Sequence, residues 1–211
     1  KVVDSDDWVN AVALQHVLNR LEELEAEGGV DLMVCNYVYE HEDRSLFSTI
    51  RYRSIFPENQ VVTWDQTGRF HANQYLTLHS AIYRTEIIRQ SGIVLPKHIF
   101  YEDNLFVYAP LPLTKKLIYM DEDLYRYLIG REGQSVSEQV MMKRCTHQIE
   151  IAQRIFDMHD IKAVLRENPK LGRYMYHEAC FMLVIATVFT RLNRTEEAEQ
   201  KVRDMWAHCM K

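Results

Sequence analysis

The first half of the chain alternates between helical and extended patterns. Apolar residues recur at intervals of three and four from Val9 to Leu24, which predicts an amphipathic helix that ends at Gly28. We expect Asp6 or Asp7 to cap the start of this helix. Further expected elements are strands over residues 30–39, 47–52 and 75–83, with a polar turn over residues 40–44, and short helices over residues 61–64, 85–90 and 99–108.

The second half of the chain becomes helical after two more extended segments. Strands are expected over residues 117–120 and 124–129, a polar loop over residues 130–135, and helices over residues 138–158, 172–192 and 195–210. The pattern predicts a mixed α/β part over residues 1–135 and an all-α part over residues 136–211. The apolar run over residues 179–189 is shorter than the roughly 20 residues of a membrane-spanning helix, so we expect a buried core helix there.

Composition narrows the class of protein. With 211 residues, 47% of them hydrophobic, the chain can build a sizeable core. A net charge of −5 argues against a non-specific nucleic-acid binder, which displays a basic face to phosphates. The cysteines have no CxxC spacing, which favours reduced thiols and a cytoplasmic protein; they are Cys35, Cys145, Cys180 and Cys209.

A cluster of carboxylates follows the apolar pair Val2–Val3. The pattern suggests a strand end that presents Asp4 and Asp6, and carboxylate oxygens are the donors that Mg²⁺ and Mn²⁺ prefer. A solvated turn or a helix cap is the alternative. An EF-hand is excluded because its glycine and glutamate positions would be Val9 and Gln15.

A second acidic pair, Glu102 and Asp103, follows Phe100–Tyr101 at the expected start of a helix. A carboxylate in this position can face a cleft and act as a general base. Capping of the helix is the alternative explanation.

The two acidic motifs, about a hundred residues apart, resemble those of the inverting family-two glycosyltransferases, which have the GT-A fold. The chain differs at Ala81, where many members of that family carry a lysine. The resemblance implies that a nucleotide-binding half would precede Lys1, so we expect a partial GT-A domain that is weakly active or inactive alone. The matching segments are residues 2–8, 35–37, 82–88 with Gly92, 102–103, 125–127 and 131–137.

The resemblance also implies roles for individual residues. Asp6 and Asp4 would bind Mn²⁺ or Mg²⁺ on the donor diphosphate, and Asp4 and Arg131 would contact the donor itself. Asp103 would be the general base toward an acceptor hydroxyl, and Glu102 would position it.

The same resemblance suggests partners and a biological setting. The donor would be a UDP-sugar and the acceptor a saccharide or lipid-linked saccharide, in bacterial cell-envelope polysaccharide biosynthesis. The protein would lie in the cytoplasm or at the inner face of the membrane. Apolar positions of the last helices would cap the mixed part, form a homodimer, or contact a membrane surface.

Two other classes of function remain open. One is a non-enzymatic interaction module built on the helices over residues 136–211. The other is a metal-dependent phosphohydrolase, since haloacid dehalogenase-type phosphatases also begin with Asp-X-Asp, although they continue with Gly-Thr or Gly-Val where this chain has Asp7–Trp8. Weaker acceptor or metal candidates are His41, Trp64, Phe70, His71, Tyr75 and His98.

Overall fold

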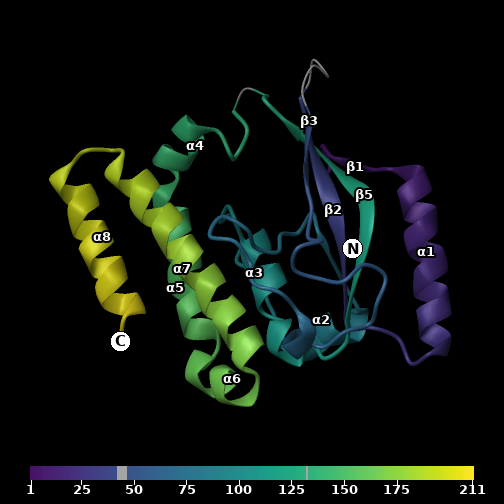
Figure 1. Cartoon of the computed structure of the whole chain (residues 1–211). Helices are drawn as coiled ribbons and strands as arrows, with labels where there is room; N and C mark the ends of the chain where they lie inside the picture. The colour runs from purple at the N-terminus through teal and green to yellow at the C-terminus, as the bar shows by residue number, and fades with distance from the viewer. Residues whose placement is uncertain (42–46, 132) are drawn as a thin grey trace.

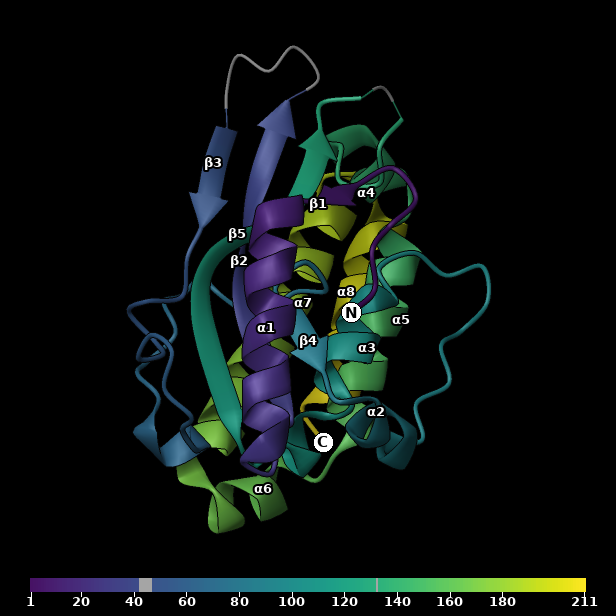
Figure 2. The same ribbon diagram turned by 90° about the vertical axis from the view of Figure 1, so that its right-hand side faces the viewer.

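A five-stranded mixed sheet separates helix α1 from the remaining helices. The computed structural model describes residues 1–41, 47–131 and 133–211. Figures 1 and 2 show α1 packed on one face of the sheet and the other helices on the opposite side, with α5, α7 and α8 farthest from α1. The strands are β1 (Trp8–Val9), β2 (Leu32–His41), β3 (Phe47–Ile50), β4 (Ala81–Tyr83) and β5 (Leu117–Ile129).

The sheet has the order β1-β5-β2-β3, and β4 pairs with the start of β2. β2 and β5 run parallel, whereas β1, β3 and β4 pair antiparallel with their neighbours. The expected hairpin of β2 and β3 is confirmed, but residues 42–44 of its expected turn lie outside the described residues. The two strands expected between residues 117 and 129 form one continuous strand, β5.

Helix α1 begins one turn later than its acidic residues suggested. The side chain of Asn10 accepts hydrogen bonds from the backbone amides of Val12 and Ala13, both at 3.0 Å. The expectation that Asp6 or Asp7 caps this helix is therefore wrong. The helices are α1 (Ala11–Ala26), α2 (Thr85–Ser91), α3 (Asp103–Tyr108), α4 (Glu138–Lys143), α5 (Cys145–Met158), α6 (Ile161–Glu167), α7 (Pro169–Arg191) and α8 (Glu196–Cys209).

Several expected elements are shorter than their patterns indicated. Residues 1–7 form no strand, and the strand expected over residues 75–83 is formed only by β4. The helix expected from residue 99 begins at Asp103, because His98 and Tyr101 have left-handed backbone angles (φ 61° and 70°) that an α-helix excludes. Residues 64–66 form a single 3-10 turn instead of a helix over residues 61–64.

The C-terminal part is helical, as the pattern predicted, but contains more breaks. The helix expected over residues 138–158 divides at Arg144 into α4 and α5, and α6 was not predicted. Within the described residues, no helix is both long enough and apolar enough to cross a membrane.

Both faces of the sheet are buried. On the α1 face, Val17 and Leu24 pack with Met33 and Ile118 of the central strands. On the opposite face, one core extends from the sheet through α3 and α5 to α7 and α8. The hydroxyl of Tyr174 on α7 accepts a hydrogen bond from the backbone amide of Leu76 at 3.0 Å, which ties the helical part to the mixed part.

Candidate functional site

The carboxyl ends of the parallel strands β2 and β5 lie at the same edge of the sheet. There, Tyr37 pairs with Tyr125 and Tyr39 with Tyr127 across the two strands. Parallel strands place their following loops at one edge, which is where ligands bind in many α/β proteins. The carboxylates predicted from the sequence gather at this edge, in two cavities that share part of their lining.

The first cavity, of about 430 Å³, is lined by the N-terminal carboxylates and by the loop that follows β5. Asp6 and Arg131 form an ion pair across it. Thus the predicted metal ligand and the predicted diphosphate contact lie directly against each other. The lining residues are Asp4, Asp6, Asp7, Tyr127, Arg131, Gly133, Gln134 and Ser135.

Asp7 is fixed by the end of β5. Its carboxylate accepts a hydrogen bond from the Tyr125 hydroxyl at 2.7 Å and another from the Leu128 amide at 3.0 Å. The Tyr125 hydroxyl also accepts a hydrogen bond from the Asp4 amide at 3.2 Å. These bonds hold the acidic turn on the sheet edge although residues 1–7 form no regular element.

The side chains that come close enough to share a cation are Asp4, Asp7 and His79, whose ligand atoms lie within 4.8 Å of one another. This set overlaps the expected pair of Asp4 and Asp6 at Asp4 only. Burial, and then the charge of Asp6, raises the pKa of Asp4, and burial raises that of Asp7. Gathered carboxylates of this kind suit a divalent cation with oxygen ligands.

His79 is suited chemically to the same set. Burial lowers the pKa of His79 to about 3, so its ring is neutral, and Nδ1 has no hydrogen-bond partner among the described residues. The ring stacks on Tyr127 with centroids 4.3 Å apart, which fixes its plane. A neutral imidazole with an available nitrogen can ligate a metal or accept a proton.

The second cavity, of about 400 Å³, contains Asp103 and adjoins the first. Asp4, Tyr127 and Ser135 line both cavities. Burial, then the charge of Glu102 and then that of Asp4, raises the pKa of Asp103 to about 6. A carboxylate with a pKa in this range can accept a proton near neutral pH more readily than an ordinary aspartate.

The loop before Asp103 is tied to the loop after β5. The Tyr101 hydroxyl donates a hydrogen bond to the carbonyl oxygen of Ser135 at 2.9 Å. The side-chain amide of Asn104 donates to the carbonyl oxygen of Tyr101 at 2.9 Å, which holds the turn at Tyr101, where the backbone is left-handed. The predicted base and the predicted diphosphate contact therefore lie on connected loops.

Aromatic side chains form most of the remaining wall of the second cavity, and sequence reasoning missed most of them. Tyr37 and Tyr39 lie two residues apart in β2, so their side chains share one face of the sheet. That spacing was a usable signal, whereas nothing near His79 in the sequence distinguished it. Of the expected aromatic candidates, Tyr75 lines this cavity, while Trp64 and Phe70 are buried in the core.

Comparisons with known proteins support the fold. No family model matches the sequence, and no curated protein matches it either. A crystal structure of residues 1–349 of S. aureus TarS in complex with UDP-GlcNAc superposes with a TM-score of 0.52 and 17% sequence identity. The match covers 97% of this chain and 64% of that chain. The chain therefore has a glycosyltransferase-like mixed α/β fold and spans less than two thirds of the matched structure.

Proposed function

We propose that this chain belongs to an enzyme that transfers a sugar from a nucleoside diphosphate sugar to an acceptor hydroxyl. The observation that carries the proposal is the pair of adjoining cavities, one with Asp4, Asp6 and Arg131 and the other with Asp103. A fold shared with TarS, which was crystallised with UDP-GlcNAc, supports a UDP-sugar as the donor.

In this proposal the first cavity binds the diphosphate of the donor. Asp4 and Asp7, with Asp6 or His79, would hold Mn²⁺ or Mg²⁺, which supplies positive charge to the departing diphosphate. Arg131 adds a guanidinium that can form two parallel hydrogen bonds with phosphate oxygens. Its Nε is buried without a hydrogen-bond partner among the described residues, which leaves a donor available for such a contact.

The second cavity binds the acceptor. Asp103 takes the proton from the attacking hydroxyl, and Glu102 keeps the pKa of Asp103 raised. The aromatic wall that includes Tyr37, Tyr39 and Tyr75 offers faces on which a sugar ring can pack. In this proposal the hydroxyl attacks the anomeric carbon from the face opposite the diphosphate, which inverts the anomeric centre; the placement of Asp103 in the adjoining cavity supports this direction of attack.

The proposal is tested by separating binding from turnover. Calorimetry should show that UDP binds in the presence of Mn²⁺, and that Asp4→Ala weakens this binding at least tenfold because it removes a carboxylate that every version of the metal site requires. Asp103→Asn should leave UDP binding unchanged and lower UDP release from UDP-GlcNAc about 100-fold or more, as loss of a general base does. The exposed Asp204→Asn on α8 is the matched control and should change neither measurement.

Two outcomes would favour other functions. Mn²⁺-dependent release of phosphate from p-nitrophenyl phosphate, unchanged by Asp103→Asn, would indicate a phosphohydrolase. Binding of UDP that is absent, or that is unaffected by Asp4→Ala, would contradict the proposed donor cavity.

A further inference from the structure

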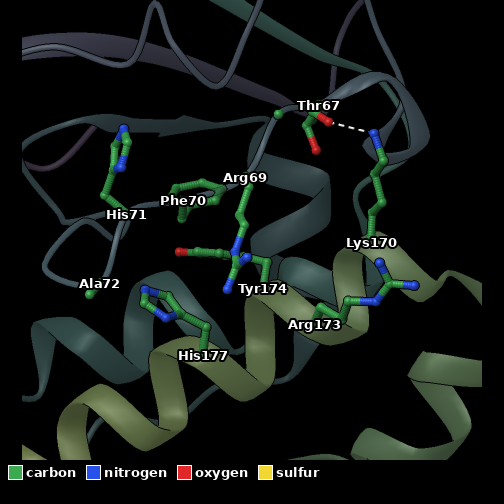
Figure 3. Close-up of a pocket in the computed structure, with 10 residues that line it drawn as sticks. Thr67, Arg69, Phe70, His71, Ala72, Lys170, Arg173, Tyr174 and His177 are labelled. Carbon is green, nitrogen blue, oxygen red and sulfur yellow. Dashed lines mark hydrogen bonds between the residues drawn. The ribbon is translucent and has the colours of Figure 1, made fainter.

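A third cavity, of about 910 Å³, opens between residues 67–72 and the N-terminal half of α7 (Figure 3). The chain has a net charge of −5, yet none of the described residues that line this cavity is acidic. Basic side chains make up half of its lining, and they are Arg69, His71, Lys170, Arg173 and His177.

The positive charges at the rim are not balanced by protein carboxylates. Arg69, Lys170 and Arg173 are exposed, and within the described part of the chain none of them forms an ion pair with Asp or Glu. The nearby acids Asp65 and Glu167 line a different cavity.

One further acid, Glu178, lies on the same helix and is fully buried. Burial raises the pKa of Glu178 to about 8, which keeps its carboxyl mainly neutral at pH 7. It therefore offsets little of the positive charge of the cavity.

The loop that carries Arg69 is held closely against the core. The amide of Gly68 donates a hydrogen bond to the carbonyl oxygen of Ile55 at 2.6 Å. A Cβ at Gly68 would lie 2.7 Å from the carbonyl oxygen of Ser54, so only glycine permits this approach. On the other side, Lys170 donates to the carbonyl oxygen of Thr67 at 2.6 Å, drawn as a dashed line in Figure 3.

The floor of the cavity is aromatic and tightly packed. The ring of Tyr174 stacks on Phe70, with centroids 4.2 Å apart, and on Trp64 at 5.4 Å. Figure 3 shows Phe70 and Tyr174 near the middle of the lining residues, with His71 on the left and Arg173 and Lys170 on the right. A floor fixed in this way holds the loop and α7 at a set distance, so the backbone positions that carry the basic groups need no rearrangement for a ligand to bind.

The position on α7 strengthens the positive potential. This helix has 23 residues, and Lys170 and Arg173 belong to its first turn or two. The N-terminal end of a helix carries partial positive charge, equivalent to roughly half an elementary charge. This partial charge lies beside Lys170 and adds a small share to the positive potential at that end of the cavity.

We propose that this cavity binds the phosphate groups of an anionic ligand, at a site separate from the two carboxylate-lined cavities. Guanidinium groups match phosphate oxygens with paired hydrogen bonds, and a volume of about 910 Å³ accommodates several phosphate groups or a phosphorylated sugar. This binding does not depend on sugar transfer. The helix that supplies Lys170 and Arg173 also lines the Asp103 cavity, through Phe181, Met182 and Ile185.

The test measures binding of tripolyphosphate by calorimetry in the presence of EDTA, so that no metal is available to the carboxylate cavities. Wild-type protein should bind, and the double substitution Arg69→Gln with Arg173→Gln should weaken binding at least tenfold. These two arginines form no ion pair within the described residues, so their replacement should preserve the fold, which circular dichroism checks. The ring resonances of His71 and His177 in NMR spectra should shift on binding, since both line the cavity.

A matched control removes the same charge elsewhere. Arg89→Gln with Arg203→Gln changes two exposed arginines on α2 and α8 that do not line the cavity, and it should leave the affinity unchanged. Equal weakening by both double variants, or no binding by wild-type protein, would overturn the proposal.

Further arms identify the source of the phosphate. Competition by sn-glycerol 3-phosphate would assign the site to soluble phosphate esters. If the wild type floats with phosphatidylglycerol vesicles and only the double variant of Arg69 and Arg173 fails to do so, the site binds lipid headgroups. Both results place phosphate in the cavity. If the double variant of Arg69 and Arg173 equals the wild type in tripolyphosphate binding, competition and flotation, the proposal is contradicted.

Discussion

At the scale of single residues, Asp103 has the most informative environment. Its carboxyl lies in the aromatic cavity beside Glu102, close enough to Asp4 for that charge to act on it. The pKa of about 6 means that the carboxylate form, which accepts protons, dominates above that pH.

We therefore expect UDP-GlcNAc turnover to fall as the pH decreases through about 6, because Asp103 becomes protonated. Glu102→Gln removes a charge that raises the pKa of Asp103, so the acid limb of the profile of kcat/KM should move to lower pH. The measurement is the rate of UDP release between pH 5 and 9, and Glu86→Gln on the exposed face of α2 is the control. An acid limb that Glu102→Gln leaves in place would contradict this role.

The sequence predicted site residues that lie within a short motif, but not those that reach the site from a distant part of the chain. Asp4, Asp6, Glu102, Asp103 and Arg131 were all candidates, and the structure brings them to two adjoining cavities. The close approach of His79 to Asp4 and Asp7 was not predictable, because it arises where the segment before β4 packs against Tyr127 of β5 and the N-terminal turn.

At the scale of elements, the contact of α6 with α7 depends on one glycine. Gly172 lies in the first turns of α7, and a Cβ there would be 2.7 Å from the backbone nitrogen and Cα of Leu165. The same turns of α7 carry Lys170 and Arg173 to the basic cavity.

Replacing Gly172 by alanine should change the free energy of unfolding in the direction opposite to that usually seen for a glycine inside a helix. A Gly→Ala change inside a helix ordinarily stabilises a protein by about 0.5–1 kcal/mol. We expect Gly172→Ala to lower the free energy of unfolding by about 1–3 kcal/mol, because the added methyl group forces two helices apart. Urea unfolding followed by circular dichroism measures this, and a stabilised variant would show that α6 can move without loss.

Local patterns predicted the elements that carry their own signals. The amphipathic spacing of α1 and the short helix expected over residues 85–90, which ends at Gly92, both have counterparts in the structure. The pattern over residues 75–83 misled because the amide of Leu76 binds the Tyr174 hydroxyl instead of a strand neighbour. Contacts with residues about a hundred positions away are absent from any local window.

At the scale of the whole molecule, a buried acid lies where the sheet packs on the helical part. Glu178 on α7 is fully buried, and neither of its oxygens has a hydrogen-bond partner among the described residues. Its charge acts on tyrosines of both parts, including Tyr52, Tyr83 and Tyr174. Ionisation of the Glu178 carboxyl would therefore affect the packing of the mixed part on the helical part.

The pKa of Glu178 is raised by burial from 4.5 to about 8. The folded state therefore holds a proton that the unfolded state has lost between these pH values, and stability should decrease as the pH rises from about 4.5 to 8. Glu178→Gln removes this ionisation, so the variant should lose that decrease and exceed the stability of the wild type at pH 9.

Urea unfolding at pH 6 and pH 9 measures the difference, with the exposed Glu167→Gln of α6 as the control. Parallel pH dependence in wild type and Glu178→Gln would show that the carboxyl is not responsible for the effect.

The parallel pairing of β2 with β5 also belongs to this scale. Their paired residues are separated by about 85 positions, so a long loop must close before the edge that carries Asp7 and Tyr127 can form. Sequence reasoning found the two strands and the mixed class, but local periodicity contains no information on which strands become neighbours.

Helix α7 lines two of the cavities and fixes the distance between them. His177 lines the basic cavity and Phe181 lines the Asp103 cavity, so at 1.5 Å per residue their nearest parts are roughly 6 Å apart along the helix axis. A phosphate in the basic cavity and a hydroxyl beside Asp103 can therefore belong to one ligand of moderate length. Because the helix is rigid, it would then favour ligands whose phosphate and hydroxyl are separated by the matching distance.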